Sequence, residues 1–426
     1  MNIEEIKSDR VAEKYYKINH PSGLTIYVYP KEGYSSAYAI FGTRYGSINT
    51  NFSVDDGAKI TVPDGIAHYL EHKLFESEEG DAFVRYAETG ANANAYTSFE
   101  KTCYLFSCTE KFDESLEILL DFVQSPYFTA ETVAKEQGII GQEIKMYDDS
   151  PDWRVMFNML ENMYHNHPVK IDIAGTVESI AEITAEKLYE VYNVFYNLNN
   201  MVLCVSGNVT VEQVLKTADK MLKPCKEHKI INYFENEPYE IVKPYVEQSF
   251  SVAMPIFNLG FKEKADAVSG DKASAHTDIM MSMLASSTST LYRKLMDEKL
   301  INDSFSYEVF DGPGYCSVIF GGESREPERA AEIIKEYISK VKSEGIDREE
   351  FEIAKKAVYG NTVSTLNSVD SIANILADHH FKGDRMFDYI EEIANATYED
   401  VTARLQSMLD VNNATLSVVK PAGKEE

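Results

Sequence analysis

Residues 65–76, Gly-Ile-Ala-His-Tyr-Leu-Glu-His-Lys-Leu-Phe-Glu, contain the pattern His-x-x-Glu-His. His68 and His72 are four positions apart, so on a helix both imidazoles lie on one face and can bind the same metal ion. Glu71 directly precedes His72, where its carboxylate can take a proton from a water molecule at that metal. The preceding Pro-Asp-Gly at 63–65 predicts the start of this helix.

A third metal ligand is expected from a second helix. A catalytic zinc commonly has three protein ligands and one open position. The helix predicted over 131–146 offers Glu136 and Glu143, which are seven positions apart and therefore on one face. One carboxylate can bind the metal while the other supports a ligand through a hydrogen bond. Spacing alone does not assign the two roles, and a solvated helix face is the alternative explanation of the pair.

His68, Glu71 and His72, together with this later glutamate pair, make the chain similar to the inverzincins of the pitrilysin family of zinc metallopeptidases. That family includes insulin-degrading enzyme and the β subunit of mitochondrial processing peptidase. The resemblance covers the whole chain and is to bacterial members of half length. It implies a Zn2+ cofactor held by His68, His72 and Glu143, with Glu71 and Glu136 as the catalytic residues.

The segment 90–97, Gly-Ala-Asn-Ala-Asn-Ala-Tyr-Thr, resembles the substrate-binding edge strand of that family. The residues expected to line a bound peptide are Asn92, Ala93, Asn94 and Ala95. The free backbone groups of an edge strand can pair with an extended peptide, which gives binding through the main chain. An ordinary edge strand without a ligand is the alternative.

The second half of the chain echoes the first. Thr184 and Thr397 begin predicted helices that lead to the similar segments 199–205 and 412–418, with an offset of 213 positions in both cases. We therefore predict an α+β fold of two tandem similar domains, each a mainly antiparallel sheet with helices packed on one face. The predicted boundaries are a catalytic zinc-binding domain over 1–223, a linker over 224–245 and a homologous domain without metal over 246–426.

The second half departs from the family pattern. Active members carry an Arg and a Tyr in the second domain, where they help to hold the substrate and stabilise the oxyanion. Met296 and Asp303 stand at the corresponding positions of this chain. Arg293 and Tyr307 are the nearby residues that can replace them, and a partner chain is the other possible source.

Composition limits the partners of the chain. Its net charge of −28 repels phosphate, so no nucleic-acid partner is expected. The sequence has no run of apolar residues long enough to span a membrane, and its N-terminus has no apolar segment typical of a secretory signal. The 5 cysteines include no Cys-x-x-Cys, which favours a reducing, cytoplasmic location over a disulfide framework.

Together with the resemblance, these observations predict a zinc-dependent endopeptidase that hydrolyses short or unfolded peptides, and the resemblance implies that it does so inside a closed chamber. The resemblance implies that one such chain forms half of the chamber, as a homodimer or as a heterodimer with a related chain. One alternative is a zinc-bearing subunit of a hetero-oligomeric processing complex with a catalytically inactive partner. Another is a non-catalytic peptide-binding protein. The intact Glu71 favours catalysis, since a structural zinc needs no base and usually has a fourth protein ligand.

Overall fold

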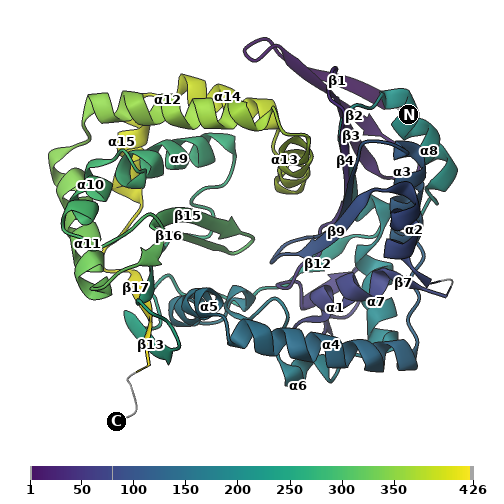
Figure 1. Cartoon of the computed structure of the whole chain (residues 1–426), viewed down its shortest axis with the longest axis horizontal. Helices are drawn as coiled ribbons and strands as arrows, with labels where there is room; N and C mark the ends of the chain where they lie inside the picture. The colour runs from purple at the N-terminus through teal and green to yellow at the C-terminus, as the bar shows by residue number, and fades with distance from the viewer. Residues whose placement is uncertain (1, 79, 423–426) are drawn as a thin grey trace. The chain divides into compact units, whose positions relative to one another are not determined.

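The computed structural model describes residues 2–78 and 80–422, which form two compact units (Figure 1). Neither unit is continuous in sequence. Unit 1 comprises Met1–Ile144, Asp172–Tyr233 and Val363–Phe387, and unit 2 comprises Lys145–Ile171, Phe234–Thr362 and Asp388–Glu426. Each half of the sequence therefore gives a segment to the unit built mainly from the other half. The domain boundaries derived from the sequence repeat stay a prediction.

Unit 1 is built on a seven-stranded sheet. In spatial order its strands are β1 (Asn2–Ser8), β2 (Glu13–Asn19), β3 (Thr25–Pro30), β11 (Met201–Gly207), β4 (Ala37–Thr43), β10 (Thr102–Cys108) and β9 (Asn92–Thr97). All neighbours are antiparallel except β3 and β11. Every residue of β4 and β11 is buried, as expected for central strands that are covered on both faces. Strand β9 forms one edge of the sheet.

Helices and short strands complete unit 1. Its helices are α1 (Ile66–Leu74), α2 (Ala82–Thr89), α3 (Phe112–Val123), most of α4 (Ala130–Asp148), α6 (Val177–Ile180), α7 (Ala185–Phe195), α8 (Val211–Met221), α13 (Val369–Lys382) and the 3-10 turn η2 (Leu198–Asn200). Its short strands are β5 (Asn51–Val54), β6 (Ile60–Thr61), β12 (Ile230–Asn232), β7 (Glu76–Ser77) and β8 (Gly80–Asp81). Strand β12, which lies within the predicted linker, pairs with β5.

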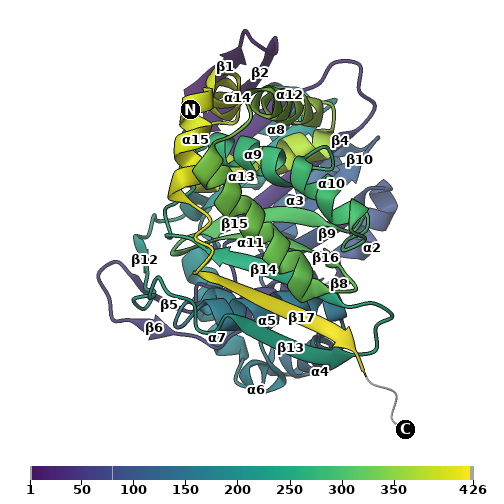
Figure 2. The ribbon, with the colours of Figure 1, turned by 90° about the vertical axis from the view of Figure 1, so that its left-hand side faces the viewer.

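Unit 2 contains a five-stranded sheet. In spatial order its strands are β13 (Tyr245–Phe250), β17 (Ala414–Pro421), β14 (Ile256–Lys262), β16 (Tyr315–Glu323) and β15 (Ser306–Gly312), as seen around β17 in Figure 2. The other elements are α5 (Pro151–Met163), η1 (Pro168–Lys170), α9 (Asp271–Ala285), α10 (Thr290–Asp297), α11 (Pro327–Glu344), α12 (Arg348–Thr365), α14 (Met386–Asn395) and α15 (Tyr398–Ser407). Apolar side chains of β14, β16, β17, α9, α10, α11, α12, α14 and α15 form one continuous core, and Tyr307 and Val309 of β15 pack against it. The ends of α12 and α14 cross the boundary between the two units.

The two sheets repeat one topology, which supports the predicted internal repeat. The order β3-β11-β4-β10-β9 in unit 1 corresponds to β13-β17-β14-β16-β15 in unit 2. In each series the first pair is parallel and the remaining pairs are antiparallel. Together with the helices, this arrangement confirms the predicted α+β class with two similar domains.

The halves of the chain also exchange one helix, which the sequence analysis did not predict. Helix α13, from the second half, packs on β11 and β4 of unit 1, whereas α5, from the first half, packs on β17 and β14 of unit 2. Gly42 on β4 permits the close approach of α13 to the sheet of unit 1. A Cβ on Gly42 would lie 2.8 Å from Cys103 Sγ and 3.3 Å from Phe381 at the end of α13. The unit built mainly from the first half of the sequence is therefore completed by a helix from the second half (Figure 1).

Candidate metal centre and active site

Helix α1 presents the His-x-x-Glu-His pattern as the sequence predicts. The helix begins at Ile66, directly after Gly65, whose φ of 87° is left-handed. A Cβ at Gly65 would also approach the carbonyl oxygen of Ala174 too closely, so both backbone and space require glycine there. The rings of His68 and His72 lie on one face, with centroids 4.6 Å apart. The predicted start of the helix is confirmed.

Glu143 on α4 faces both imidazoles. The distance between His68 Nε2 and Glu143 Oε1 is 3.7 Å, and that between His72 Nε2 and Glu143 Oε2 is 3.4 Å. One ligand atom from each of the three side chains lies within 4.8 Å of the other two. Ligand atoms at usual zinc distances and tetrahedral angles are about 3.3 Å apart. The donor set of two nitrogens and one carboxylate thus fits a zinc ion in chemistry and in spacing.

Glu136 lies on α4 two helical turns before Glu143 and contacts the other ring nitrogen of His72, Nδ1. Its Oε1 lies 3.0 Å from His72 Nδ1. Burial opposes the charge of Glu136, but the hydrogen bond from His72 outweighs it, and the pKa of this carboxyl falls below its usual value. A carboxylate in this place fixes the ring orientation and leaves Nε2 to face a metal. This is the supporting position that the resemblance implies for Glu136.

The two histidines have opposite protonation preferences. Burial, with the neighbouring His72, lowers the pKa of His68 to about 4. Burial also disfavours charge on His72, but its hydrogen bonds to Glu136 and Glu143 prevail and raise the pKa of His72 to about 10. Without metal, the site therefore holds one imidazolium between two carboxylates.

We expect zinc uptake near neutral pH to displace about one proton, that of His72, because His68 is already neutral. Apparent zinc affinity should then rise about tenfold per pH unit between roughly pH 5 and pH 7, below the range in which a zinc-bound water ionises. A raised folded-state pKa also means that this imidazolium stabilises the metal-free protein below about pH 6.5 and ceases to do so as the pH approaches 10. Titration calorimetry in buffers of different ionisation enthalpy measures the proton count. At about pH 6, where a zinc-bound water is still mostly protonated, release of two protons or of none would contradict these assignments.

The matched variant for this measurement is Glu136→Gln. The amide keeps the shape of the side chain but removes the charge that favours protonated His72. Proton release at pH 7 should therefore decrease in the variant. Zinc affinity should fall about 10- to 100-fold, the usual cost of losing a partner that orients a ligand.

Glu71 lies beside the ligand set and is held by strand β9. Its Oε2 accepts a hydrogen bond of 2.7 Å from Thr97 Oγ1. Burial raises the pKa of Glu71, the hydrogen bond from Thr97 and the charge of His72 lower it, and Glu143 raises it further, with a net increase. The structure thus joins His68, His72, Glu136 and Glu143 directly and connects Glu71 to them electrostatically.

Thr97 is the site contact that the sequence analysis missed. It ended the predicted strand but received no role. Side chains alternate along a strand, so Thr97 shares a face with Ala93 and Ala95, and β9 packs against α1. That alternation is a signal that could have directed attention to the Thr97 hydroxyl. The four residues predicted to line a peptide all lie in β9: Asn92 and Asn94 are exposed, and Ala93 and Ala95 are half-buried.

The two residues considered as replacements for the missing Arg and Tyr lie in unit 2. Arg293 is on α10, where its Nε donates to the carbonyl oxygen of Ser289 at 3.4 Å. Tyr307 is on β15 and lines a cavity of about 420 Å³. Burial and the nearby Asp278 raise the pKa of Tyr307. A role for either residue in substrate binding stays a prediction.

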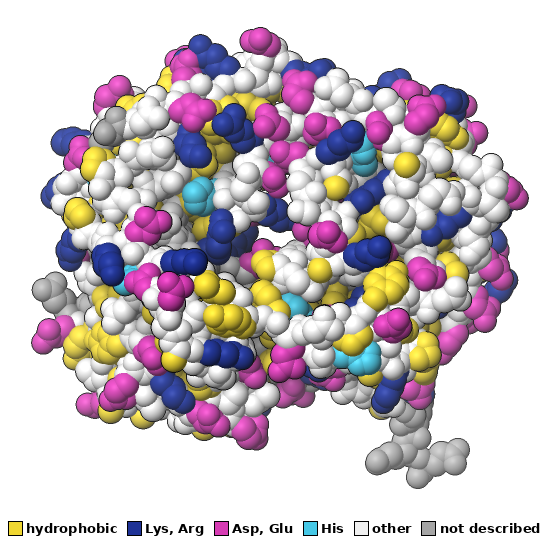
Figure 3. Space-filling view, turned by 180° about the vertical axis from the view of Figure 1, so that it is seen from behind, with side chains coloured by type: hydrophobic (Ala, Val, Ile, Leu, Met, Phe, Trp, Pro, Cys, Tyr) yellow, Lys and Arg dark blue, Asp and Glu magenta, His cyan; other side chains and the backbone are white. Residues whose placement is uncertain are grey.

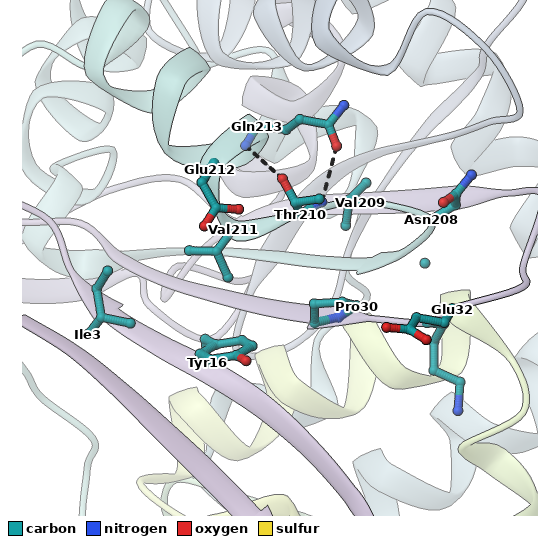
Figure 4. A pocket seen from close by; sticks show the side chains of 12 residues that line it. Ile3, Tyr16, Pro30, Glu32, Asn208, Val209, Thr210, Val211, Glu212 and Gln213 are labelled. Atoms are coloured by element: carbon teal, nitrogen blue, oxygen red, sulfur yellow. Dashed lines mark hydrogen bonds between the residues drawn. The ribbon is translucent and has the colours of Figure 1, made fainter.

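Unit 1 has a cavity of its own, of about 440 Å³. It is lined by residues of β1, β2 and β3 and by the start of α8 (Figure 4). Thr210 caps α8 there: its hydroxyl accepts from the backbone N–H of Gln213, whose side chain in turn accepts from the Thr210 N–H. None of the predicted site residues lines this cavity.

Comparison with known proteins gives the same family along nearly the whole chain. The model of the insulinase family (peptidase family M16) matches residues 53–177, and the model of the peptidase M16 inactive domain matches residues 182–358. The zinc protease YmfH of Bacillus subtilis (strain 168) is 39% identical over 426 residues, covering 98% of this chain and 99% of its own length. The β subunit of mitochondrial-processing peptidase from Caenorhabditis elegans is 28% identical over 215 residues, 48% of this chain and 44% of that protein.

Solved structures agree with this relationship. An M16-like peptidase from Alicyclobacillus acidocaldarius has a TM-score of 0.92 and 34% identity, with 99% of each chain covered. A protease from Helicobacter pylori has a TM-score of 0.83 at 21% identity and shows the shared fold. The similarity to YmfH and to the Alicyclobacillus structure spans nearly the full length of all three chains. The predicted relationship is confirmed: this chain belongs to the insulinase or pitrilysin family, peptidase family M16, as a half-length bacterial type.

Proposed function

We propose that this chain is a zinc-dependent endopeptidase that hydrolyses short or unfolded peptides. The observation that carries the proposal is the convergence of His68, His72 and Glu143 beside the partly buried Glu71. Relatives named zinc proteases, including YmfH and YmxG of Bacillus subtilis, support the same metal and the same chemical class.

In this proposal His68, His72 and Glu143 hold the zinc ion, and Glu136 keeps His72 oriented by its hydrogen bond. When bound, zinc polarises the scissile carbonyl, lowers the pKa of the attacking water and stabilises the developing oxyanion. The Glu71 carboxylate takes the proton from that water and then gives it to the nitrogen of the leaving amine. Its raised pKa suits both transfers, because burial makes the protonated form accessible nearer to neutral pH.

Strand β9 is the proposed peptide-binding element. It pairs with β10 alone among the described strands, so its other edge has no strand partner, and there a peptide would compete only with local contacts such as that of the Ala95 N–H with Asn94 Oδ1, 2.9 Å. A peptide that adds to this edge as a further strand would lie along Asn92, Ala93, Asn94 and Ala95, next to α1. Such main-chain pairing requires an extended substrate, which favours short or unfolded peptides over folded proteins.

We further propose that the working enzyme is a dimer enclosing a chamber, either of two copies or with a related chain. Met296 and Asp303 occupy the positions of the family's substrate-binding Arg and Tyr, and this favours the second candidate function. In that function the chain is the zinc-bearing subunit of a processing complex, and a catalytically inactive relative supplies those groups. A relative in this family carries the name of a processing-peptidase subunit.

The remaining expectations concern location and other partners. None of the helices in the described residues is both long enough and apolar enough to cross a membrane. None of the 5 cysteines forms a disulfide, which is compatible with the cytoplasmic location that we propose. On the face shown in Figure 3, carboxylates and cations are interspersed, although the chain carries a net charge of −28. That charge supports the proposal of a peptide substrate rather than nucleic acid.

Cleavage of an unstructured basic peptide by this chain alone tests the proposal. The protein is stripped of metal, reloaded with one zinc per chain and assayed by mass spectrometry of the products. We expect internal cleavage that needs zinc. Absence of cleavage with zinc bound would contradict a self-sufficient peptidase and would direct the assay to a related partner chain.

A further inference from the structure

We propose that Thr97 is a positioning residue for the general base, because its hydroxyl holds the Glu71 carboxylate against the strand that binds the peptide. The inference rests on the proposed function, which gives Glu71 the role of base. Thr97 Oγ1 and Glu71 Oε2 are 2.7 Å apart. This distance is typical of a strong hydrogen bond to an ionised acceptor.

The direction of this hydrogen bond follows from its neighbours. Thr102 faces Thr97 across the β9–β10 pair, with 3.5 Å between the hydroxyl oxygens. The single hydroxyl proton of Thr102 goes to the carbonyl oxygen of Tyr45, which is closer, at 2.9 Å. An ionised carboxylate can only accept, so Thr97 is the donor to Glu71. In the part of the chain that the structure describes, Thr97 is the one hydrogen-bond donor to this carboxylate.

The backbone around Thr97 is held from two sides, so its hydroxyl has a fixed place. The N–H of Ser98 donates to the carbonyl oxygen of Lys101 at 2.8 Å, which closes the turn after β9. Helix α13 adds two contacts: Tyr96 Oη donates to Asn374 Oδ1 at 3.1 Å, and Lys101 forms an ion pair with Asp378. The end of β9 is therefore anchored both by its own hairpin and by the exchanged helix.

The hydrogen bond connects the position of the base to the position of the substrate. A general base must lie within hydrogen-bond reach of the proton that it removes. A glutamate reaches such a place through three side-chain torsions, and the last of these is broad unless a partner holds the carboxylate. With Oε2 held by Thr97, Oε1 is left to meet the attacking water, and the holding residue ends the strand along which the peptide is proposed to lie.

The test uses three variants of the full-length, zinc-loaded chain: Thr97→Val, Thr97→Ser and Thr102→Val. The first removes the hydroxyl at nearly constant volume, and the second restores it. The third is the matched control, since the Thr102 hydroxyl is buried and bonds to the backbone instead of Glu71. For each variant, kcat, KM, zinc affinity and a crystal structure of the zinc-loaded protein are obtained.

We expect Thr97→Val to lower kcat by about 10- to 100-fold, since misplacement of a catalytic group by about 1 Å costs on this order. KM and zinc affinity should stay within about twofold of the parent, because the interaction acts in the transition state. Thr97→Ser should restore most of kcat, and Thr102→Val should keep it. In the crystal structure of Thr97→Val, the Glu71 carboxylate should leave the place that it keeps in Thr97→Ser.

Four results would overturn the inference: unchanged kcat in Thr97→Val, a rise in KM without a loss of kcat, weaker zinc binding as the cause of the loss, or an equal loss in Thr102→Val. Failure of the proposed function looks different, because the parent protein would then cleave no peptide. In that case the crystal structures alone decide the matter: a Glu71 carboxylate that stays in place in Thr97→Val shows that Thr97 does not position it.

Discussion

Glu71→Gln is expected to abolish peptide hydrolysis while zinc and fold remain. Glutamine matches glutamate in size but cannot take a proton, and a positioned general base contributes roughly 10²- to 10⁴-fold in rate. We expect kcat to fall by at least about 100-fold. Zinc affinity should change little, because the three proposed ligands lie outside this substitution. Steady-state kinetics and zinc analysis of the purified variant measure both effects.

Glu131→Gln is the matched control for this experiment. Glu131 is an exposed glutamate in the first turn of α4, and the same chemical change there should leave kcat unchanged. Retained turnover in Glu71→Gln would remove Glu71 from its role as base. Loss of zinc from Glu71→Gln would instead make Glu71 a ligand and contradict the assignment of Glu143.

Residues 1–223 alone are expected to lack a stable, zinc-binding fold, although they contain every proposed catalytic residue. This fragment lacks α13, whose Ile372, Ala373, Leu376 and Ala377 are at most 2% exposed. Burying one Ile or Leu side chain contributes about 1.5–3 kcal/mol, so losing α13 costs on the order of 5 kcal/mol. A domain has only about 5–15 kcal/mol of stability in total. Scanning calorimetry of the fragment should show no cooperative transition near that of the full chain.

Coexpression with residues 224–426 is the control for the fragment. The second fragment contains α13 and should restore zinc binding and a cooperative transition to the mixture. A fragment 1–223 that unfolds cooperatively and binds zinc by itself would show that α13 is dispensable for unit 1. The predicted boundary at 223 would then also be a boundary of independent folding.

The part of the site that could be predicted from the sequence is the part that depends only on the spacing of residues within one helix. Two histidines four positions apart and two glutamates seven apart must share helix faces, whatever the rest of the chain does. Consequently the His68–His72 pair and the Glu136–Glu143 pair could be specified before the structure, and the His68–Glu143 and His72–Glu136 contacts agree with them. The assignment of Glu143 rather than Glu136 as the proposed metal ligand needed the family resemblance, because the spacing is the same for both.

The exchange of α5 and α13 could not be derived in this way. The 213-residue offset shows that the halves are similar, but similar halves can exchange equivalent helices without any change in sequence pattern. Whether α13 covers its own sheet or that of the other half depends on long-range packing, such as the contact between Gly42 and Phe381. The Thr97–Glu71 hydrogen bond could not be predicted for the same reason. It joins a strand to a helix, and the spacing of residues within each element does not give their relative position.

The most direct test of the account is a crystal structure of zinc-loaded Glu71→Gln with an unstructured peptide, with diffraction data collected at the zinc absorption edge. We predict one zinc peak bound by His68 Nε2, His72 Nε2 and Glu143, with the peptide paired along the free edge of β9. Zinc bound by four protein side chains, or a peptide bound away from β9, would contradict a catalytic metal centre at this place.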